Sequence, residues 1–140
     1  MITQLSVFLQ NDAGRLAHLT RRLADADINL MDLFVADTSD FGIVRIFCDT
    51  PQKACQLLRE AQYRASLTEV IAVRVPHQAG GLARLLEFMD ANDINIEYGY
   101  CFSIDDSAIN VMKVEDEGVE EKLAAAGFEL VQPSEIYALD

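Results

Sequence analysis

The chain repeats itself at a spacing of 66 residues. When residues 5–35 are laid over residues 71–101 without a gap, nine positions are identical, whereas composition alone would give roughly two or three. The identical pairs are Val7/Val73, Ala13/Ala79, Gly14/Gly80, Leu16/Leu82, Ala17/Ala83, Leu19/Leu85, Asp27/Asp93, Ile28/Ile94 and Asn29/Asn95. We therefore interpret the chain as a duplication, with one repeat over residues 1–69 and a second over residues 70–140.

Both repeats begin with the pattern of a strand followed by a helix. Alternating apolar residues are typical of a strand with one buried face, and they occur at Leu5, Val7 and Leu9 and again at Ile71, Val73 and Val75. Apolar residues then recur on one helical stripe, at Leu16, Leu19 and Leu23 and at Leu82, Leu85, Leu86 and Met89. The helices are expected to end at Asp27 and Asp93, because aspartate tolerates the left-handed backbone common just past a helix.

The middle of each repeat reads as two strands joined by a polar turn. The second strands are expected to open at residues 28–29 and 94–95, and the third strands cover residues 43–48 and 108–114. The turns between them fall at residues 37–40 and 103–107, which are rich in Asp, Ser and Thr.

A second helix and a fourth strand complete each repeat. Thr50 and Pro51 have the residue types of an N-cap and a first-turn proline, while Asp116 or Glu117 opens the later helix and Gly127 closes it. The fourth strand at residues 66–69 runs without a loop into residues 70–75, so we expect one long strand to join the repeats. The order β-α-β-β-α-β predicts an α+β, ferredoxin-like fold, with antiparallel sheets and helices on one face.

The charge of the chain excludes several classes of partner. Eleven basic residues face 23 acidic ones, for a net charge of −12, which disfavours binding to nucleic acid and to an anionic membrane surface. No stretch approaches the ~20 apolar residues of a membrane helix. Residues 1–4 lack the basic region of a secretory signal, so a cytoplasmic location is expected.

No motif in the sequence points to catalysis, to a metal or to a cofactor. The three cysteines form no C-x-x-C pair, and only two histidines are present, so we expect no metal site. Phosphate-binding and dinucleotide-binding glycine motifs are absent. A small phosphatase of this topology would need an arginine in its first loop; Arg15 is the candidate, and Gly81 stands at the equivalent position. We therefore expect a protein that is not an enzyme and needs no cofactor.

The repeated loop–helix junction is the candidate ligand site. A helix N-terminus presents unpaired N–H groups and a partial positive charge that suit a small carboxylate, and a glycine lets the ligand approach the backbone. Polar residues beside it, Asn11 and Asp12 or His77 and Gln78, could meet an ammonium group or another polar end of a ligand. Gly14 and Gly80 could equally serve turn geometry alone. Asn29 and Asn95 could close the turn after the helix through a local hydrogen bond.

The length of the helix constrains how such a site is built. About 13 residues separate Gly14 from Asp27, and at ~1.5 Å per residue the helix spans roughly 20 Å. The glycine loop and the Ile-Asn pair therefore lie at opposite ends of one repeat. They meet only if a second repeat lies alongside, related by a two-fold axis, so that the loop of one repeat faces the asparagine of the other.

This combination resembles the ACT domain, a family of regulatory modules that bind amino acids. The resemblance rests on the strand, the loop Asn11-Asp12-Ala13-Gly14-Arg15-Leu16 and Ile28-Asn29, and in the second repeat on His77-Gln78-Ala79-Gly80-Gly81-Leu82 and Ile94-Asn95. It covers almost the whole chain and implies a tandem ACT-domain protein with no attached catalytic domain. A protein of this family typically binds an amino acid between neighbouring ACT domains, as an allosteric effector.

The resemblance also implies which residues contact the ligand. The loops would contribute residues 11–16 and 77–82, and Asn29 and Asn95 would reach across from the other repeat. The chain departs from the family pattern in three respects: Ala13 and Ala79 replace a loop proline, Asp27 and Asp93 replace a glycine, and His77 replaces an asparagine. The two sites are therefore expected to differ.

Two further expectations concern partners. A homodimer is expected, because each repeat leaves sheet edges that need covering. The alternative to an amino-acid sensor is a regulatory subunit that docks on a metabolic enzyme through its sheet or its acidic surface. Residues 70–140 carry a net charge of −10 (four basic, fourteen acidic), against −2 for residues 1–69 (seven basic, nine acidic).

Overall fold

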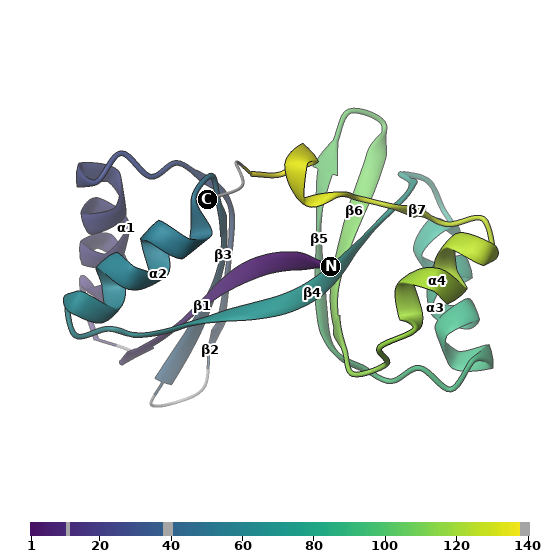
Figure 1. Cartoon of the computed structure of the whole chain (residues 1–140), viewed down its shortest axis with the longest axis horizontal. Coiled ribbons are helices and arrows are strands. Elements are labelled where there is room, and N and C mark those ends of the chain that lie inside the picture. Colours follow the sequence, from purple (N-terminus) through teal and green to yellow (C-terminus); the bar gives the residue numbers. More distant parts are fainter. Residues whose placement is uncertain (11, 38–40, 138–140) are drawn as a thin grey trace. The chain divides into compact units, whose positions relative to one another are not determined.

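The structure is a computed structural model that describes residues 1–10, 12–37 and 41–137. The chain divides into two compact units (Figure 1). The first unit holds Thr3–Thr68 together with the segment that begins at Pro133, and the second holds Met1–Ile2 and Glu69–Gln132. These units are defined by contacts within the fold, whereas the repeats are defined by sequence. The predicted boundary between the repeats, at residues 69 and 70, therefore stays a prediction.

The first unit is a sheet covered by two helices on one face. Its elements are β1 (Ile2–Gln10), α1 (Arg15–Asp25), β2 (Leu30–Asp37), β3 (Phe41–Cys48), α2 (Pro51–Glu60) and the first part of β4 (Arg64–Pro76). The strands lie in the order β2-β3-β1-β4, and β3 is antiparallel to both β1 and β2. Leu19 and Leu23 of α1 and Leu58 of α2 pack on the apolar side of β1, as the residue pattern predicts.

The second unit repeats this architecture. After the rest of β4 come α3 (Gly81–Ala91), β5 (Ile96–Ile104), β6 (Ser107–Val114), α4 (Val119–Ala125) and β7 (Glu129–Leu130). The strand order β5-β6-β4-β7 corresponds to β2-β3-β1-β4. A short 3-10 helix, Pro133–Glu135, follows in the segment that belongs to the first unit. The ferredoxin-like fold predicted from the sequence is confirmed in both units.

The duplication extends to the hydrogen-bonding register of the strands. Val7 lies opposite Val44, and 66 residues later Val73 lies opposite Asn110. The edge strands β2 and β5 also match, because each has a bulge at the equivalent position. The bulge lies between Leu30 and Asp32 in β2 and between Ile96 and Tyr98 in β5. A one-residue slip would turn a whole strand inside out, so this agreement fixes which side chains face the helices in both units.

The ends of α1 and α3 are confirmed. Asp27 and Asp93 both have left-handed backbones, with φ of 58° and 55°. This turn lets the amide of Ile28 donate to the carbonyl of Leu23 (3.0 Å) and the amide of Ile94 to that of Met89 (2.9 Å), which satisfies carbonyls that the helix leaves unpaired.

The long strand expected to join the repeats is confirmed as β4.

The predicted start of the last helix is corrected. Asp116 and Glu117 do not open α4; Gly118 is its N-cap residue, and Asp116 precedes it. The Asp116 carboxylate accepts a hydrogen bond from the Gly118 amide (2.8 Å) and pairs with Lys122 (2.7 Å). These contacts, chiefly the bond to Lys122, lower the pKa of the Asp116 carboxyl. Asp116 therefore fixes the turn before the helix.

Thr50 occupies the predicted N-cap position of α2, followed by Pro51, but its side chain does not cap the helix. Its hydroxyl donates instead to the Asp49 carboxylate (3.2 Å). The predicted turn at residues 38–40 lies outside the described residues.

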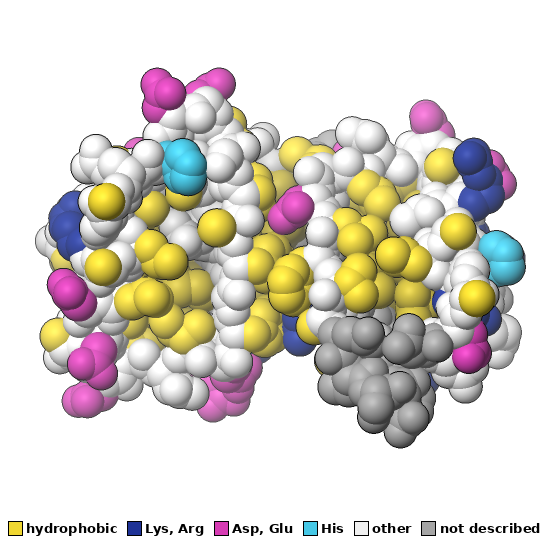
Figure 2. All heavy atoms as spheres, turned by 180° about the vertical axis from the view of Figure 1, so that it is seen from behind, with side chains coloured by type: hydrophobic (Ala, Val, Ile, Leu, Met, Phe, Trp, Pro, Cys, Tyr) yellow, Lys and Arg dark blue, Asp and Glu magenta, His cyan; other side chains and the backbone are white. Residues whose placement is uncertain are grey.

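Hydrophobic side chains reach the surface of both units (Figure 2). In the first unit they include Met31, Phe34 and Val35 on the edge strand β2, and in the second Leu82 and Leu86 on α3. None of the described helices has the length and apolar character needed to cross a bilayer.

Candidate functional site

The two loop–helix junctions have the same backbone conformation. Gly14 (φ 82°, ψ −5°) and Gly80 (φ 90°, ψ −13°) are the N-cap residues of α1 and α3, and within the described part of the chain no side chain caps either helix. In each loop the amide after the glycine donates to the carbonyl three residues back: Arg15 to Asp12 (3.3 Å) and Gly81 to Gln78 (3.1 Å). The left-handed φ accounts for the glycines by turn geometry.

Both loops present their backbone to solvent. Asp12, Ala13 and Gly14 are exposed, as are His77, Gln78, Ala79 and Gly80. Leu16 and Leu82, in the first turn of each helix, are also exposed, at 38% and 47%. Because a helix N-terminus carries partial positive charge, these exposed first turns can receive a small anion. Asn11, another predicted contact, lies outside the described residues.

The second repeat has a separate reason for a glycine at position 81. A Cβ atom there would collide with the backbone carbonyl oxygen of Pro76. Arg15 stands at the equivalent position of the first repeat and carries a long side chain. The two junctions therefore share a backbone but differ in the side chain that begins the helix.

Asn29 and Asn95 lie at the far ends of α1 and α3 from these glycines. Each helix has 11 residues, which at 1.5 Å per residue span about 16 Å. The structure therefore does not bring the loop and the asparagine of one unit together.

The side-chain amides of both asparagines are exposed and make no hydrogen bond within the described part of the chain. Only the backbone of Asn29 is tied down: its amide donates to the Asp49 carboxylate (3.2 Å), and its carbonyl accepts from the Asp49 amide (3.1 Å). A local hydrogen bond by the side chain, the alternative role for these residues, is thus not found at either position.

Shallow depressions lie beside both helices, on the side of the edge strands. One of about 660 Å³ is lined by Ala17, Thr20 and Ala24 of α1 and by Asn29. One of about 320 Å³ is lined by Leu82 and Leu86 of α3 and by Gly99 and Cys101 of β5. In each unit the exposed side of the first helix and the edge strand thus form one continuous surface.

The residues that sequence reasoning missed lie on the opposite flank of the loops. In the first unit a cavity of about 520 Å³ is lined by the predicted residue Arg15 and by two missed residues, Tyr63 and Arg64, which follow α2. In the second unit a cavity of about 430 Å³ is lined by the predicted residues 78–81 and by two missed residues, Arg84 and Phe128. The available signal was the aromatic residue that ends the turn after the second helix in both repeats, Tyr63 and Phe128.

A guanidinium group lies over that aromatic ring in each unit. The Cζ atom of Arg15 is 5.8 Å from the Tyr63 ring centroid, and that of Arg84 is 4.8 Å from the Phe128 centroid. The arginines come from different helical positions, the first residue of α1 and the second turn of α3. Both units therefore place a cation on an aromatic face, a favourable contact, beside the start of a helix.

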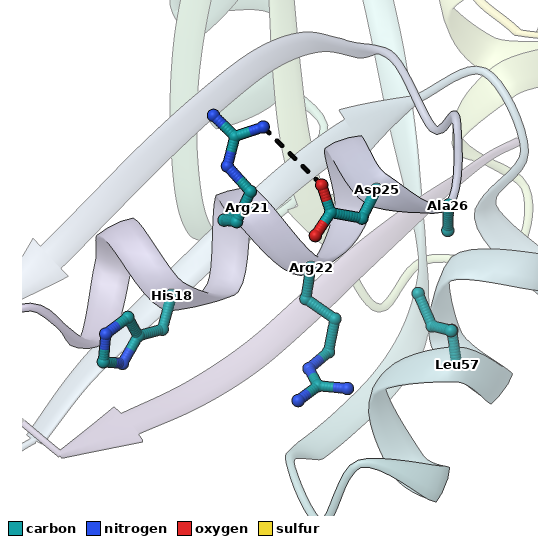
Figure 3. Close-up of a pocket in the computed structure, with 6 residues that line it drawn as sticks. All are labelled: His18, Arg21, Arg22, Asp25, Ala26 and Leu57. Atoms are coloured by element: carbon teal, nitrogen blue, oxygen red, sulfur yellow. Dashed lines mark ion pairs between the residues drawn. The ribbon is translucent and has the colours of Figure 1, made fainter.

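Another depression, of about 450 Å³, contains none of the predicted site residues (Figure 3). It is lined by His18, Arg21, Arg22 and Asp25 of α1, with Leu57 of α2. Arg21 and Asp25 form an ion pair at 3.6 Å, with side chains 74% and 69% exposed. An exposed pair of this kind contributes little to stability, and we assign no role to this depression.

The chain is similar to known proteins over nearly its whole length. Residues 1–136 match the model of a family described as an ACT domain pair. The crystal structure of protein BT0572 from Bacteroides thetaiotaomicron is 34% identical, with a TM-score of 0.92 over 99% of this chain and 96% of that one. No curated protein matches the sequence.

Regulatory subunits of aspartate kinase have the same fold. The subunit from Thermus thermophilus is 17% identical, with a TM-score of 0.66, and the one from Thermus flavus is 15% identical, with a TM-score of 0.62. Each match covers 89% of this chain and 90% of the other. With the match over residues 1–136 and the repeated ferredoxin-like architecture, the chain belongs to the family of paired ACT domains.

Proposed function

We propose that this protein is a non-catalytic regulator that binds a small amino acid at its loop–helix junctions, each site being completed by a second ACT-like repeat. One observation carries the proposal: both repeats present the same glycine turn, with no side chain capping the helix, and an exposed asparagine at the far end of that helix. Glycine turns alone would serve any helix, but in both units the exposed asparagine side chain makes no hydrogen bond to any described residue.

The chemistry of an amino acid suits these groups. Its carboxylate would accept hydrogen bonds from the first-turn amides of α1 or α3, where the helix dipole favours negative charge. Its ammonium group would be held by polar loop residues (Asn11 and Asp12, or His77 and Gln78) and by Asn29 or Asn95 of the other repeat. Because His77 stands where Asn11 stands in the first repeat, the two sites would differ in affinity.

A site assembled from two repeats also explains how binding would regulate. A ligand that contacts both repeats stabilises the arrangement in which they meet, and the difference in affinity between arrangements sets the size of the shift. The likeness to regulatory subunits of aspartate kinase supports a regulatory role. By the same likeness, we propose a metabolic enzyme as the class of regulated partner. We also propose a cytoplasmic location.

A homodimer forms part of this proposal. Met31, Phe34 and Val35 are 46%, 40% and 43% exposed on the edge strand β2. An edge strand that exposes apolar side chains and unpaired backbone groups is suited to pairing with another chain. Sedimentation of the full chain, alone and with amino acid, measures whether it dimerises.

A thermal-shift panel of the common amino acids tests the proposal. A ligand at 100 times its Kd adds about 2.7 kcal/mol to the free energy of unfolding, which raises Tm by several degrees. We expect Asn29→Ala and Asn95→Ala to reduce the shift. Asn92→Ala is the matched control, since that side chain donates to the Phe88 carbonyl of the adjoining helix (2.9 Å) and to no other described residue. If no amino acid raises Tm and calorimetry detects no heat of binding, the proposal is wrong.

A further inference from the structure

The 520 Å³ cavity of the first unit carries positive charge that the described residues do not neutralise. Arg15 and Arg64 both line it, with Gln10 and Gln62, and no carboxylate among the described residues does so. The Nε atom of Arg15 is buried and has no hydrogen-bond partner among the residues that the structure describes. In a chain with a net charge of −12, it is unusual for two arginines to line one cavity with no acidic residue among the described lining residues. A buried donor without an acceptor is costly, which suggests that the acceptor comes from a ligand.

The walls of this cavity combine charge with flat apolar surface. The guanidinium of Arg15 lies over Tyr63, and that of Arg64 lies over Phe8, with 5.7 Å from its Cζ atom to the ring centroid. Stacking on a ring leaves the edge of a guanidinium, with its N–H groups, open to an acceptor. The forked geometry of those N–H groups matches a carboxylate or a phosphate.

The second unit provides an internal comparison. The turns after α2 and α4 correspond at a spacing of 65 residues: Gln62 and Gly127 are both left-handed, with φ of 69° and 89°. The next residues correspond too, since the Tyr63 amide donates to Leu58 (2.9 Å) and the Phe128 amide to Leu123 (3.0 Å). Glu129 therefore occupies the place of Arg64.

This replacement places a carboxylate in the cavity of the second unit, beside one of the two arginines that line it. Arg74, equivalent to Phe8, forms an ion pair with Glu129 at 3.2 Å. The corresponding cavity of the second unit thus contains its own carboxylate, whereas that of the first unit contains none among the described residues. Of the matched positions that line the two cavities, Arg64 and Glu129 are the pair in which a basic residue of the first unit is replaced by an acidic one.

We propose that the cavity of the first unit binds a small organic oxyanion. The ligand carries a carboxylate or a phosphate that accepts hydrogen bonds from Arg15 and Arg64, and a flat apolar body that contacts Phe8 and Tyr63. The second unit does not bind this ligand, because the Glu129 carboxylate repels the anion and already forms an ion pair with Arg74. This proposal shares Arg15 with the predicted loop of the amino-acid site, but it uses the guanidinium of that residue, and neither Asn29 nor Asn95 takes part.

NMR of the full chain tests the proposal, with the Nε–H signal of Arg15 as the direct probe. Benzoate and phenyl phosphate represent the two oxyanions, and neutral benzamide has the same ring without the charge. We expect one or both anions to shift the Arg15 signal saturably, while benzamide does not. The anion that binds more tightly identifies which oxyanion the site prefers.

Arg64→Glu copies the charge of the second unit and should weaken binding by roughly tenfold or more. Arg21→Glu changes the charge equally at a distant exposed site and should leave binding unchanged. Arg15→Gln, followed through the backbone amide of Tyr63, provides a second variant. The proposal is overturned if neither anion saturates, if benzamide binds equally well, or if Arg64→Glu binds like the wild type. Loss of amino-acid binding in Asn95→Ala, whose side chain is proposed to complete the loop of the first repeat, with benzoate or phenyl phosphate binding retained, would separate the two sites.

Discussion

The backbone carbonyl of Pro76 occupies the place where a side chain on Gly81 would begin. We therefore expect Gly81→Ala to lower the free energy of unfolding by about 1–3 kcal/mol, because the strand end or the helix start must move. Gly42→Ala is the control, since a Cβ atom there meets only ordinary contacts at 3.9 and 4.0 Å. Urea unfolding measures both variants; equal stability of the two would contradict this explanation.

Asp93 holds a left-handed backbone that glycine adopts without strain. Asp93→Gly should raise the free energy of unfolding by about 0.5–1 kcal/mol, because it relieves that strain just past α3. Ala83→Gly, on the exposed side of the same helix, should lower it by about 1 kcal/mol. Thermal unfolding of both variants checks the opposite signs. A loss of stability in Asp93→Gly would show that the aspartate side chain is needed there.

Asn110 is 4% exposed on the side of β6 that faces the helices, where Val44 stands in the first repeat. Among the described residues, its side-chain amide has one hydrogen-bond partner, the Ala108 carbonyl, at the long distance of 3.4 Å. Asn110→Val should therefore stabilise the protein by about 1 kcal/mol, and the reverse change, Val44→Asn, should destabilise it by about 2 kcal/mol or more. Urea unfolding measures the pair. If Asn110→Val destabilises, the amide has a task that the first repeat lacks.

Glu97 shares a hydrogen bond with Glu115, and this bond raises the pKa of the Glu97 carboxyl above its ordinary value of 4.5. A raised pKa in the folded state means that stability is lost as the pH rises through that pKa. Glu115→Gln should lower the pKa of Glu97 and stabilise the protein at neutral pH but not below about pH 4. Carboxyl-carbon NMR titration follows Glu97, with Glu87→Gln as a control that leaves it unchanged. An unaltered Glu97 titration in Glu115→Gln would rule out the shared proton.

The repeat in the sequence was enough to predict the fold of both units. The alternation of Leu5, Val7 and Leu9 and its recurrence 66 residues later determine which faces are buried, and strand register follows from buried faces. The left-handed positions of Asp27 and Asp93 were also predictable, because few residue types tolerate that conformation after a helix.

Other features depend on contacts between segments far apart in the chain. Nothing local to Pro76 and Gly81 reveals that the carbonyl of one excludes the side chain of the other. The start of α4 was misplaced because the Asp116 carboxylate binds the Gly118 amide, forming a turn where a helix had been expected. The cavities beside Arg15 and Arg84 were missed because their aromatic walls come from the far end of each repeat, beyond the segment that aligns by identity.

The continuity of β4 limits how this protein can evolve. Thr68 and Glu69 are neighbours in one strand yet fall in different units, so no linker separates the two halves. An insertion or deletion of one residue in β4 would turn every following side chain of the strand to the opposite face. Natural variants should therefore keep the length of this segment constant even where the sequences of the two repeats have diverged, and changes in length should collect in the turns instead.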